Sequence, residues 1–281
     1  MKGTVSGRSR AFGGKPVINE PIGRRQASAV AERGTSTGVM SPSSPVGKSG
    51  SKMSGKGKLK EGVRLFRAKC WDDSLKELMN VDSDGLGEHE KTELSYYLAL
   101  CFTKVGRLVD ATPYFEQVVA ASEDLLRVYQ CRMTLAYIHV TTGRPKMAEF
   151  ELGRLLDSGF ESAQLFNTMA YAAYSRKHYR HAIEYYEKAL KLDDSNATAL
   201  NSMGYILVDT GIDPAKGLRY CRKAVDIQPE NAAYLDSLGW ACYKCKEPAA
   251  ARTWLRKAFE LAPHETTIRE HLRMVTGGGG Q

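Results

Sequence analysis

The chain has 281 residues and a formal net charge of +8, from 40 Lys and Arg against 32 Asp and Glu. Residues 1–57 hold ten Lys and Arg and two Asp and Glu, whereas residues 58–281 hold thirty of each kind. The excess charge therefore belongs to the N-terminal segment, which disfavours a uniformly basic nucleic-acid-binding domain. The length suits one large domain or two ordinary ones.

Signals for membrane insertion or export are missing from the sequence. No stretch approaches 18 apolar residues, so we expect no transmembrane helix. No apolar segment follows the charge at Lys2, which argues against a secretory signal. We therefore expect a cytoplasmic protein whose six cysteines are reduced thiols. They are Cys70, Cys101, Cys131, Cys221, Cys242 and Cys245.

The N-terminal segment, residues 1–57, contains eleven Gly, ten Ser and four Pro, with Phe12 as its only aromatic residue. Such a composition buries too little apolar surface to offset its backbone entropy, so a disordered basic tail is predicted. We favour a solubilising leader, and the alternative is a cationic arm that touches nucleic acid, an anionic membrane or an acidic partner. A third interpretation starts translation at Met40 or Met53 instead of Met1, and a start at Met53 would remove nearly all of this charge.

From Leu59 onward the apolar residues follow a helical period, and the sequence repeats itself. Three segments superpose without gaps in their shared stretch, namely 181–196, 217–231 and 251–265. A second helical pattern precedes each of them, which gives repeats of 34, 35 and 34 residues. The extra residue falls in the turn around Gly211, where an insertion costs little.

Small residues recur at fixed places in this frame, which extends further toward the N-terminus. When each repeat is numbered from its first residue, positions 8 and 20 are small in every clear repeat, which lets its two helices approach closely. Position 24 is mostly large and fills the groove to the next repeat. The residues at positions 8, 20 and 24 are Ala99, Ala111 and Phe115, then Ala136, Ala148 and Leu152, then Ala170, Ala182 and Tyr186, then Gly204, Gly217 and Cys221, and finally Gly239, Ala251 and Leu255.

This pattern resembles the tetratricopeptide repeat (TPR) family over about four-fifths of the chain. The resemblance implies an all-α fold, a right-handed α-solenoid of about six stacked helix-turn-helix repeats within residues 58–275. The first repeat departs most, with Glu61 and Ser74 at positions 7 and 20, and is expected to be a degenerate cap. The expected segments are repeats 55–88, 92–125, 129–162, 163–196, 197–231 and 232–265, a three-residue spacer after 125, a capping helix over 266–275 and a disordered Gly-rich end over 276–281. The last repeats look like those of many bacterial repeat proteins, which favours a bacterial source.

In this family the first helix of each repeat lines a concave face. The corresponding positions here form an aromatic stripe flanked by a short amide ladder. Asn side chains match the donors and acceptors of a peptide backbone, and Tyr and Trp offer rigid contact area. The resemblance therefore implies a groove for an extended peptide, while the alternative is that these aromatic residues only support neighbouring helices. The groove residues are Tyr96, Tyr137, Asn167, Tyr171, Tyr174, Asn201, Tyr205, Asp236, Trp240 and Tyr243.

The charge of this groove argues against one known class of partner. A subclass of the family grips chaperone C-terminal carboxylates through Lys and Asn, but here position 5 carries no Lys and position 9 carries no Asn. From residue 163 to 243 the only full charges in the groove are Asp209 and Asp236. A neutral or weakly basic peptide therefore suits it better than an acidic tail.

Catalytic and metal-binding constellations are discounted. Cys242 and Cys245 form a CxxC inside a helix, without further zinc ligands, so core packing explains Cys242 better. His178 and His181 share a helix face, but two His make a weak metal site. His139 occupies a core position and is expected to be a satisfied buried histidine. No phosphate loop or catalytic motif is present, so we expect no enzyme, no cofactor and no bound metal.

The leading hypothesis is a non-catalytic protein–protein interaction scaffold that binds a peptide segment or partner protein in the concave groove. Two alternatives stay open: an adaptor that reaches nucleic acid or a membrane surface through the basic tail, and a self-associating structural subunit.

Overall fold

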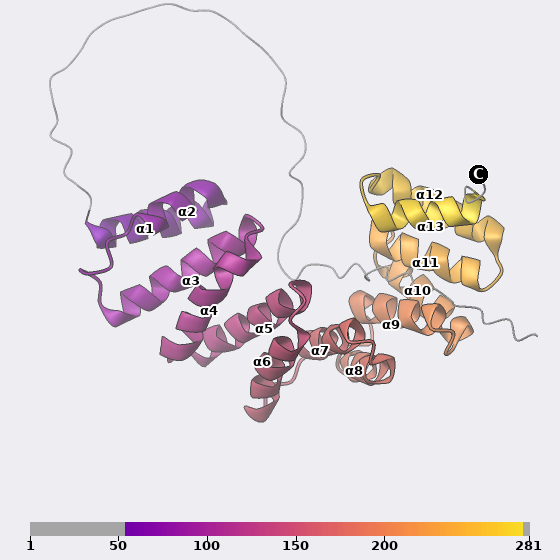
Figure 1. The fold of residues 1–281 in the computed structure, drawn as a ribbon, viewed down its shortest axis with the longest axis horizontal. Helices are drawn as coiled ribbons and strands as arrows, with labels where there is room; N and C mark the ends of the chain where they lie inside the picture. Colours follow the sequence, from indigo (N-terminus) through magenta and orange to yellow (C-terminus); the bar gives the residue numbers. More distant parts are fainter. Residues whose placement is uncertain (1–53, 278–281) are drawn as a thin grey trace, which may run out of the picture. The chain divides into compact units, whose positions relative to one another are not determined.

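A computed structural model describes residues 54–277. These residues form thirteen α-helices and no strand (Figure 1), which confirms the all-α prediction and the expected number of helices. The helices are α1 (Gly55–Arg67), α2 (Trp71–Met79), α3 (Glu88–Lys104), α4 (Leu108–Ala121), α5 (Leu125–Thr141), α6 (Pro145–Asp157), α7 (Ala163–Ser175), α8 (Tyr179–Leu192), α9 (Ala197–Asp209), α10 (Pro214–Ile227), α11 (Ala232–Lys244), α12 (Pro248–Leu261) and α13 (Thr266–Thr276). The segments predicted to be disordered lie, apart from residues 54–57 and 276–277, outside the described residues. None of the described helices is long and apolar enough to cross a bilayer.

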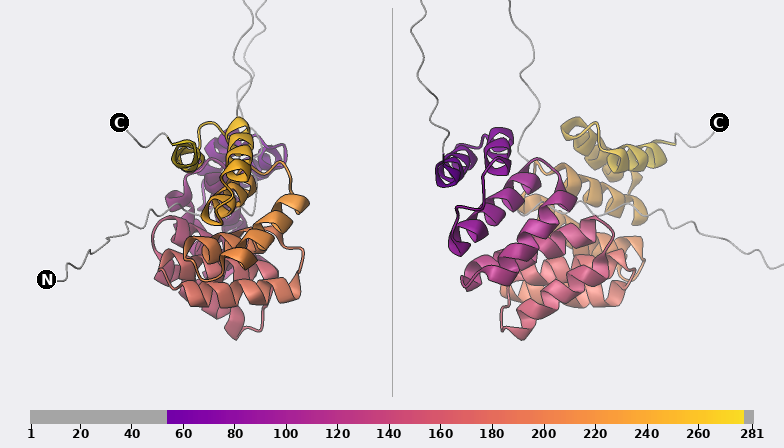
Figure 2. Two further views of the ribbon diagram at one scale, coloured as in Figure 1. Left: turned by 90° about the vertical axis from the view of Figure 1, so that its right-hand side faces the viewer. Right: turned by 60° about the vertical axis from the view of Figure 1, so that its left-hand side comes forward.

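The described residues form two compact bodies, and the boundary between them falls within α6. We call residues 54–155 the N-terminal lobe and residues 156–277 the C-terminal lobe. In the N-terminal lobe α1 packs on α2 and α3 on α4, and in the C-terminal lobe α7 packs on α8, α9 on α10 and α11 on α12 (Figure 2). Each of these hairpins corresponds to one predicted repeat.

The folded part begins where the first predicted repeat, 55–88, begins, and so within the segment assigned to the tail, 1–57. The Ser54 hydroxyl accepts a hydrogen bond from the Gly57 N–H at 3.2 Å and thereby caps α1. Helix α1 starts at Gly55, inside the segment assigned to the tail, so the boundary predicted at residues 57 and 58 is corrected to 54. The Gly-rich composition of this stretch concealed a start that depends on one capping side chain.

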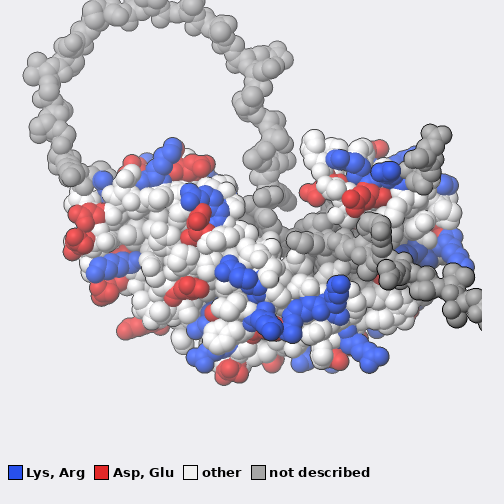
Figure 3. Space-filling model, in the orientation of Figure 1, with Lys and Arg blue, Asp and Glu red and all other residues white. Residues whose placement is uncertain are grey.

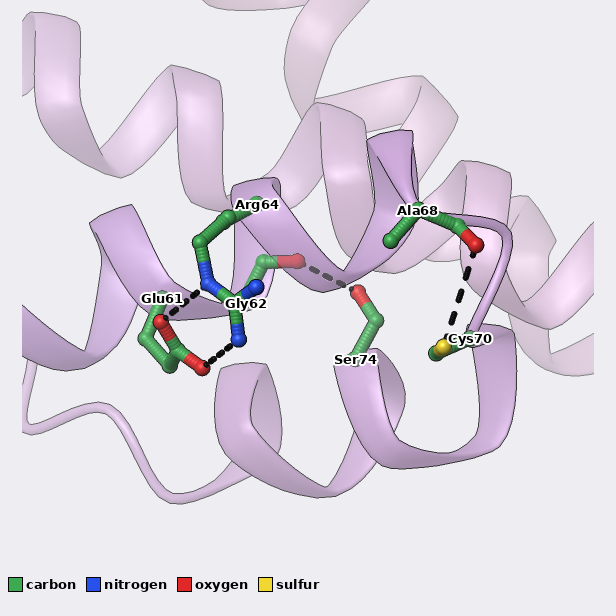
Figure 4. A network of polar contacts seen from close by, with 6 residues as sticks. All are labelled: Glu61, Gly62, Arg64, Ala68, Cys70 and Ser74. Atoms are coloured by element: carbon green, nitrogen blue, oxygen red, sulfur yellow. Dashed lines mark hydrogen bonds and ion pairs between the residues drawn. The ribbon is translucent and has the colours of Figure 1, made fainter.

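The first hairpin keeps a close helix–helix contact in spite of its unusual residues (Figure 4). The Ser74 hydroxyl of α2 donates a hydrogen bond to the Gly62 carbonyl of α1 at 2.7 Å, in the interior. A Cβ atom on Gly62 would overlap the Leu78 side chain. Glu61 is only partly buried and pairs with Arg64 at 2.6 Å, so its charge is tolerated at a position that is apolar in the family. The repeat expected to be degenerate is therefore a well-packed hairpin.

Helices α3 and α5 are longer than the repeat frame predicted, with 17 residues each. The Asp124 carboxylate accepts a hydrogen bond from the Arg127 N–H at 3.2 Å and caps α5, which begins at Leu125. The three residues predicted as a spacer after 125 are consequently the first turn of α5.

In the C-terminal lobe, glycines bring two helices into backbone contact. A Cβ atom on Gly204 of α9 would lie 2.8 Å from the Gly217 carbonyl oxygen of α10, and one on Gly217 would lie 2.6 Å from the Gly204 carbonyl oxygen. A Cβ atom on Gly239 of α11 would likewise lie 2.6 Å from Cγ of Leu255 on α12. These approaches fit the packing role predicted for positions 8 and 20.

Six turns contain a residue in the left-handed backbone region just after the first helix of a hairpin. Three of these residues are glycines with φ of 72 to 79°, and three are lysines with φ of 62 to 65°. This conformation costs an L-residue about 1–2 kcal/mol, because its Cβ approaches the following carbonyl oxygen. The glycines are Gly106, Gly143 and Gly211, and the lysines are Lys69, Lys177 and Lys246.

The last helix, α13, is amphipathic and buries one stripe of side chains. Ile268, His271 and Val275 are buried, and Ile268 and Val275 join the apolar core that includes residues of α9 to α12. Gly277 ends the helix with a φ of 81°, so α13 runs one residue beyond the predicted end at 275. This agrees with the expected role of a capping helix.

Candidate functional site

The ten predicted groove residues lie on the first helix of five hairpins, namely α3, α5, α7, α9 and α11. Tyr96 and Tyr137 belong to the N-terminal lobe, and the other eight belong to the C-terminal lobe. The candidate site is therefore built from the eight residues that three successive first helices bring into the C-terminal lobe.

These eight residues differ strongly in exposure. Tyr243 has 39% of its surface exposed, Asn167 and Tyr174 are half-buried, and the other five are buried. The predicted aromatic stripe is thus a packed layer that reaches solvent at Asn167, Tyr174 and Tyr243, rather than an open row of side chains. The buried members are Tyr171, Asn201, Tyr205, Asp236 and Trp240.

The two predicted residues of the N-terminal lobe, Tyr96 and Tyr137, are half-buried. The guanidinium carbon of Arg127 lies 4.7 Å from the centre of the Tyr96 ring, and the Tyr96 hydroxyl donates a hydrogen bond to Gln130 Oε1 at 3.5 Å. The ring and the hydroxyl of Tyr96 therefore already contact side chains of α5.

The two predicted amides have different surroundings. Asn167 Nδ2 donates a hydrogen bond to Asn196 Oδ1 at 3.0 Å, and the same oxygen caps α9 by accepting from the Ala199 N–H. Asn201 is 0% exposed, and no described residue bonds to its amide nitrogen or oxygen. An unsatisfied buried polar group costs the folded state about 1–3 kcal/mol. Asn201 is thus expected to oppose folding. Asn167 supports the residue that caps α9 through its Nδ2, while its Oδ1 bonds to no described residue.

The tyrosines of the site are neutral apolar surfaces with a polar tip. Burial is the main reason that the pKa values of Tyr171, Tyr174 and Tyr205 are raised. The nearby Asp209 carboxylate adds to the rise in pKa at Tyr174 and Tyr205. These side chains therefore keep their hydroxyl proton, and each can donate one hydrogen bond.

Asp236 and Trp240 are covered by the capping helix. The Asp236 carboxylate oxygens lie 3.0 Å from Nδ1 of His271 on α13, and both side chains are buried. The His271 ring also stacks on Trp240, with ring centres 4.3 Å apart and an angle of 14° between the planes. The expectation that these two residues line an open groove is corrected, because α13 lies over this part of α11.

The contact between His271 and Asp236 was not predicted from the sequence. His271 was counted only as part of the apolar stripe of the last helix, and Asp236 was counted as a groove residue. An acidic residue at a buried repeat position and a histidine on a buried stripe were the available signals that two polar groups meet.

The cysteines of the C-terminal lobe and the pair His178 and His181 differ in burial. Cys221 and Cys242 are buried, and the half-buried Cys245 thiol donates to the Pro214 carbonyl at 3.6 Å. Burial raises the pKa of Cys242 to about 11, so its thiol stays protonated and unreactive. His178 and His181 are exposed at the start of α8. In residues 54–277 no group of three or more His, Cys, Asp or Glu is placed to hold a metal ion.

One expectation about a core histidine is wrong. His139 is 1% exposed, but neither ring nitrogen bonds to a described residue. It is therefore buried without the hydrogen bonds that we predicted for it.

Charges on the described surface are mixed in sign. Figure 3 shows Lys and Arg interspersed with Asp and Glu over the face that it displays. This matches the equal numbers of acidic and basic residues in 58–281. The described helices therefore lack, on this face, the broad basic surface that a nucleic-acid-binding domain presents.

Comparison with known proteins supports the repeat assignment. Two models of the tetratricopeptide repeat match the chain, one over residues 163–196 and the other over residues 232–265. The chain carries tetratricopeptide repeats. Both matches have the same bounds as repeats predicted from the recurring small residues.

A TPR repeat-containing protein of Pseudomonas aeruginosa, PA4667, is 36% identical to this TPR chain over 81 residues. The matched region is 28% of this chain and only 13% of the relative. Two solved structures have a similar fold with a TM-score of 0.63 each. The crystal structure of the APC/C Cut9–Hcn1 hetero-tetramer has 13% identity and covers 80% of this chain and 43% of its own, and a tetratricopeptide repeat protein from Parabacteroides merdae has 12% identity and covers 81% and 86%.

The repeats support a role in protein–protein interaction. Proteins built from TPR repeats are generally scaffolds without catalytic activity. At 12–13% identity the solved structures establish the fold alone.

Proposed function

We propose that the TPR chain is a non-catalytic scaffold that binds an extended peptide segment of a partner protein along α7, α9 and α11 of the C-terminal lobe. The observation that carries this proposal is the Asn201 side chain, which is fully buried and has no hydrogen-bond partner among the described residues. A group that opposes folding is retained most readily where it serves binding.

The chemistry of Asn201 suits a peptide backbone. Its amide offers both donors and an acceptor, which a backbone carbonyl and N–H can complete. Because Asn201 is 0% exposed, a peptide reaches this amide only when the side chains that cover it change rotamer, a common change at binding surfaces. Because a partner would satisfy a group that is already desolvated, most of the desolvation penalty is already borne by the folded protein. The rings of Tyr174 and Tyr243, which are partly open to solvent, supply rigid contact area beside it.

The charge of the site favours a neutral or weakly basic segment. Asp209 adds a carboxylate on α9, and the groove positions of α7 and α9 carry no Lys or Arg. We therefore do not expect an acidic chaperone tail to bind this site.

The test is selection of peptides from a random phage-displayed library on the immobilised full-length chain. Replacement of Asn201 by Leu removes the amide and keeps a similar volume. We expect Asn201→Leu to raise the free energy of unfolding by about 1 kcal/mol, because an unsatisfied group is lost. We also expect the selected peptides to bind this variant at least tenfold more weakly.

The matched control is Asn80→Leu, the same change at an exposed amide at the end of α2. It should leave peptide binding unchanged. Peptides that bind wild type and Asn201→Leu equally well would show that the amide has no part in recognition, and failure to select any peptide would contradict the proposed function.

The basic tail gives a second candidate function, because residues 1–57 hold the whole net charge of the chain. An adaptor that meets a polyanion through this segment, while the repeats hold a protein, stays a proposal of its own. Self-association of the repeats is the third alternative, and light scattering over a concentration series tests it.

A further inference from the structure

The carboxylate of Asp209, at the end of α9, has one hydrogen bond and no ion pair among the described residues. Trp240 Nε1 on α11 donates to Asp209 Oδ1 at 3.2 Å. Asp209 is only half-buried, and its second oxygen receives no hydrogen bond from a described residue. A partly desolvated carboxylate of this kind attracts a cation more strongly than a fully hydrated one.

Three helices contribute aromatic residues near this carboxylate, and one of them bonds to it directly. Tyr205 lies four residues before Asp209 on α9, so the two side chains share one face of the helix. Trp240 of α11 is fixed by its hydrogen bond to the carboxylate. Tyr174 of α7 is close enough for the Asp209 charge to act on its hydroxyl. The faces of aromatic rings carry negative potential, so rings and carboxylate together favour a positive ligand.

A lysine of the chain already lies beside one of these rings. Nζ of Lys244 lies 5.1 Å from the centre of the Trp240 ring, within the range of a cation–π contact. Lys244 is exposed and makes no ion pair with Asp209. The carboxylate is therefore still available to a second positive group.

We propose that Asp209, with Tyr174, Tyr205 and Trp240, receives a Lys or Arg side chain of the bound peptide. This inference rests on the proposed function, since it names the side chain that the groove selects. Arg is the better fit of the two, because its planar guanidinium can stack on an aromatic ring while it donates to a carboxylate. The partly exposed ring of Tyr174 is the one open to such stacking, since Tyr205 is buried and His271 already stacks on Trp240.

The test uses the full-length chain and peptides selected as described above. We expect the selected sequences to carry Arg or Lys at one fixed position. In a representative peptide this residue is then replaced by citrulline, which keeps the shape and removes the charge. We expect citrulline to weaken binding to wild type at least tenfold.

The matching change in the protein is Asp209→Asn, which completes a double-mutant cycle with the peptide. It removes the charge and keeps an oxygen that can accept a hydrogen bond from Trp240. Citrulline and arginine peptides should bind this variant with affinities that differ less than twofold. The control is Asp226→Asn, the same loss of charge at an exposed site on α10 of the same lobe, where the preference for arginine should persist. Circular dichroism establishes that both variants are folded.

The two proposals fail in different ways. Peptides that need Asn201 but carry no basic residue, or that keep their preference for arginine in Asp209→Asn, overturn the cation site and leave the proposed function intact. If no peptide depends on Asn201, both proposals fall together.

Discussion

Among single residues, His139 on α5 is a titratable group that is buried without a hydrogen-bond partner among the described residues. Burial is the main cause that lowers the pKa of His139, and the positive charge of Arg144 adds to it. The folded protein therefore keeps this imidazole neutral at a pH where the unfolded chain, with a histidine pKa of about 6.5, binds a proton.

This difference predicts a pH dependence of stability. When pH falls through about 6.5, the unfolded state binds more protons than the folded state, so the free energy of unfolding decreases, whereas above that pH the contribution vanishes. We predict that His139→Leu loses less stability than wild type between about pH 7 and pH 5, measured by urea denaturation at each pH. His181→Leu, at an exposed histidine, should follow the wild-type curve. Parallel curves for wild type and His139→Leu would contradict the prediction.

At the scale of elements, the turns inside the hairpins offer an internal comparison. The same turn position holds Gly143 with a φ of 78° and Lys177 with a φ of 62°. Nothing lies within 4 Å of a Cβ placed on Gly143, so a substitution there changes only backbone strain. Lysine at this position therefore bears a strain that glycine avoids.

We predict that Lys177→Gly raises the free energy of unfolding by about 1 kcal/mol and that Gly143→Ala lowers it by about 1 kcal/mol. Chemical denaturation of the two variants and of wild type, at one pH and salt concentration, gives both values. A less stable Lys177→Gly protein would show that the lysine side chain makes a contact worth more than the strain.

The helices themselves were predictable because their packing repeats. Small residues return at fixed intervals, so the hairpins could be placed from the sequence alone. Capping side chains also recur before the first helix of five repeats and so follow the repeat frame, at Ser54, Asp124, Ser162, Asn196 and Asn231. Polar contacts between one particular pair of side chains, in contrast, have no period. The pair Asp236 and His271, which joins α11 to α13, occurs once. For the same reason the sequence indicated Asn201 as a groove amide but not that its amide is enclosed and unsatisfied.

For the molecule as a whole, charge and fold are divided between different parts of the chain. Residues 1–53 carry seven of the eight net positive charges, and the rest of the chain is nearly neutral. Attraction to a polyanion through long-range charge should therefore depend on the first 53 residues and should weaken steeply with salt.

We predict that the full-length chain binds heparin resin and elutes with added salt, whereas a chain without residues 1–53 passes through. The salt concentration at elution, compared for the two proteins, is the measurement. Equal retention of the shortened protein would show that basic residues of the helices, rather than the tail, make the contact.

Because α13 packs over α11, it also limits where an array of these repeats can be lengthened. A repeat appended after residue 265 would displace α13 and leave the buried Asp236 carboxylate without its hydrogen bond to His271, at a cost of about 1–3 kcal/mol unless a new partner is supplied. Duplication of an internal hairpin such as α9 and α10 leaves this contact untouched. Engineered or natural relatives of greater length should therefore grow from the middle and keep α11 to α13 as a transferable end piece.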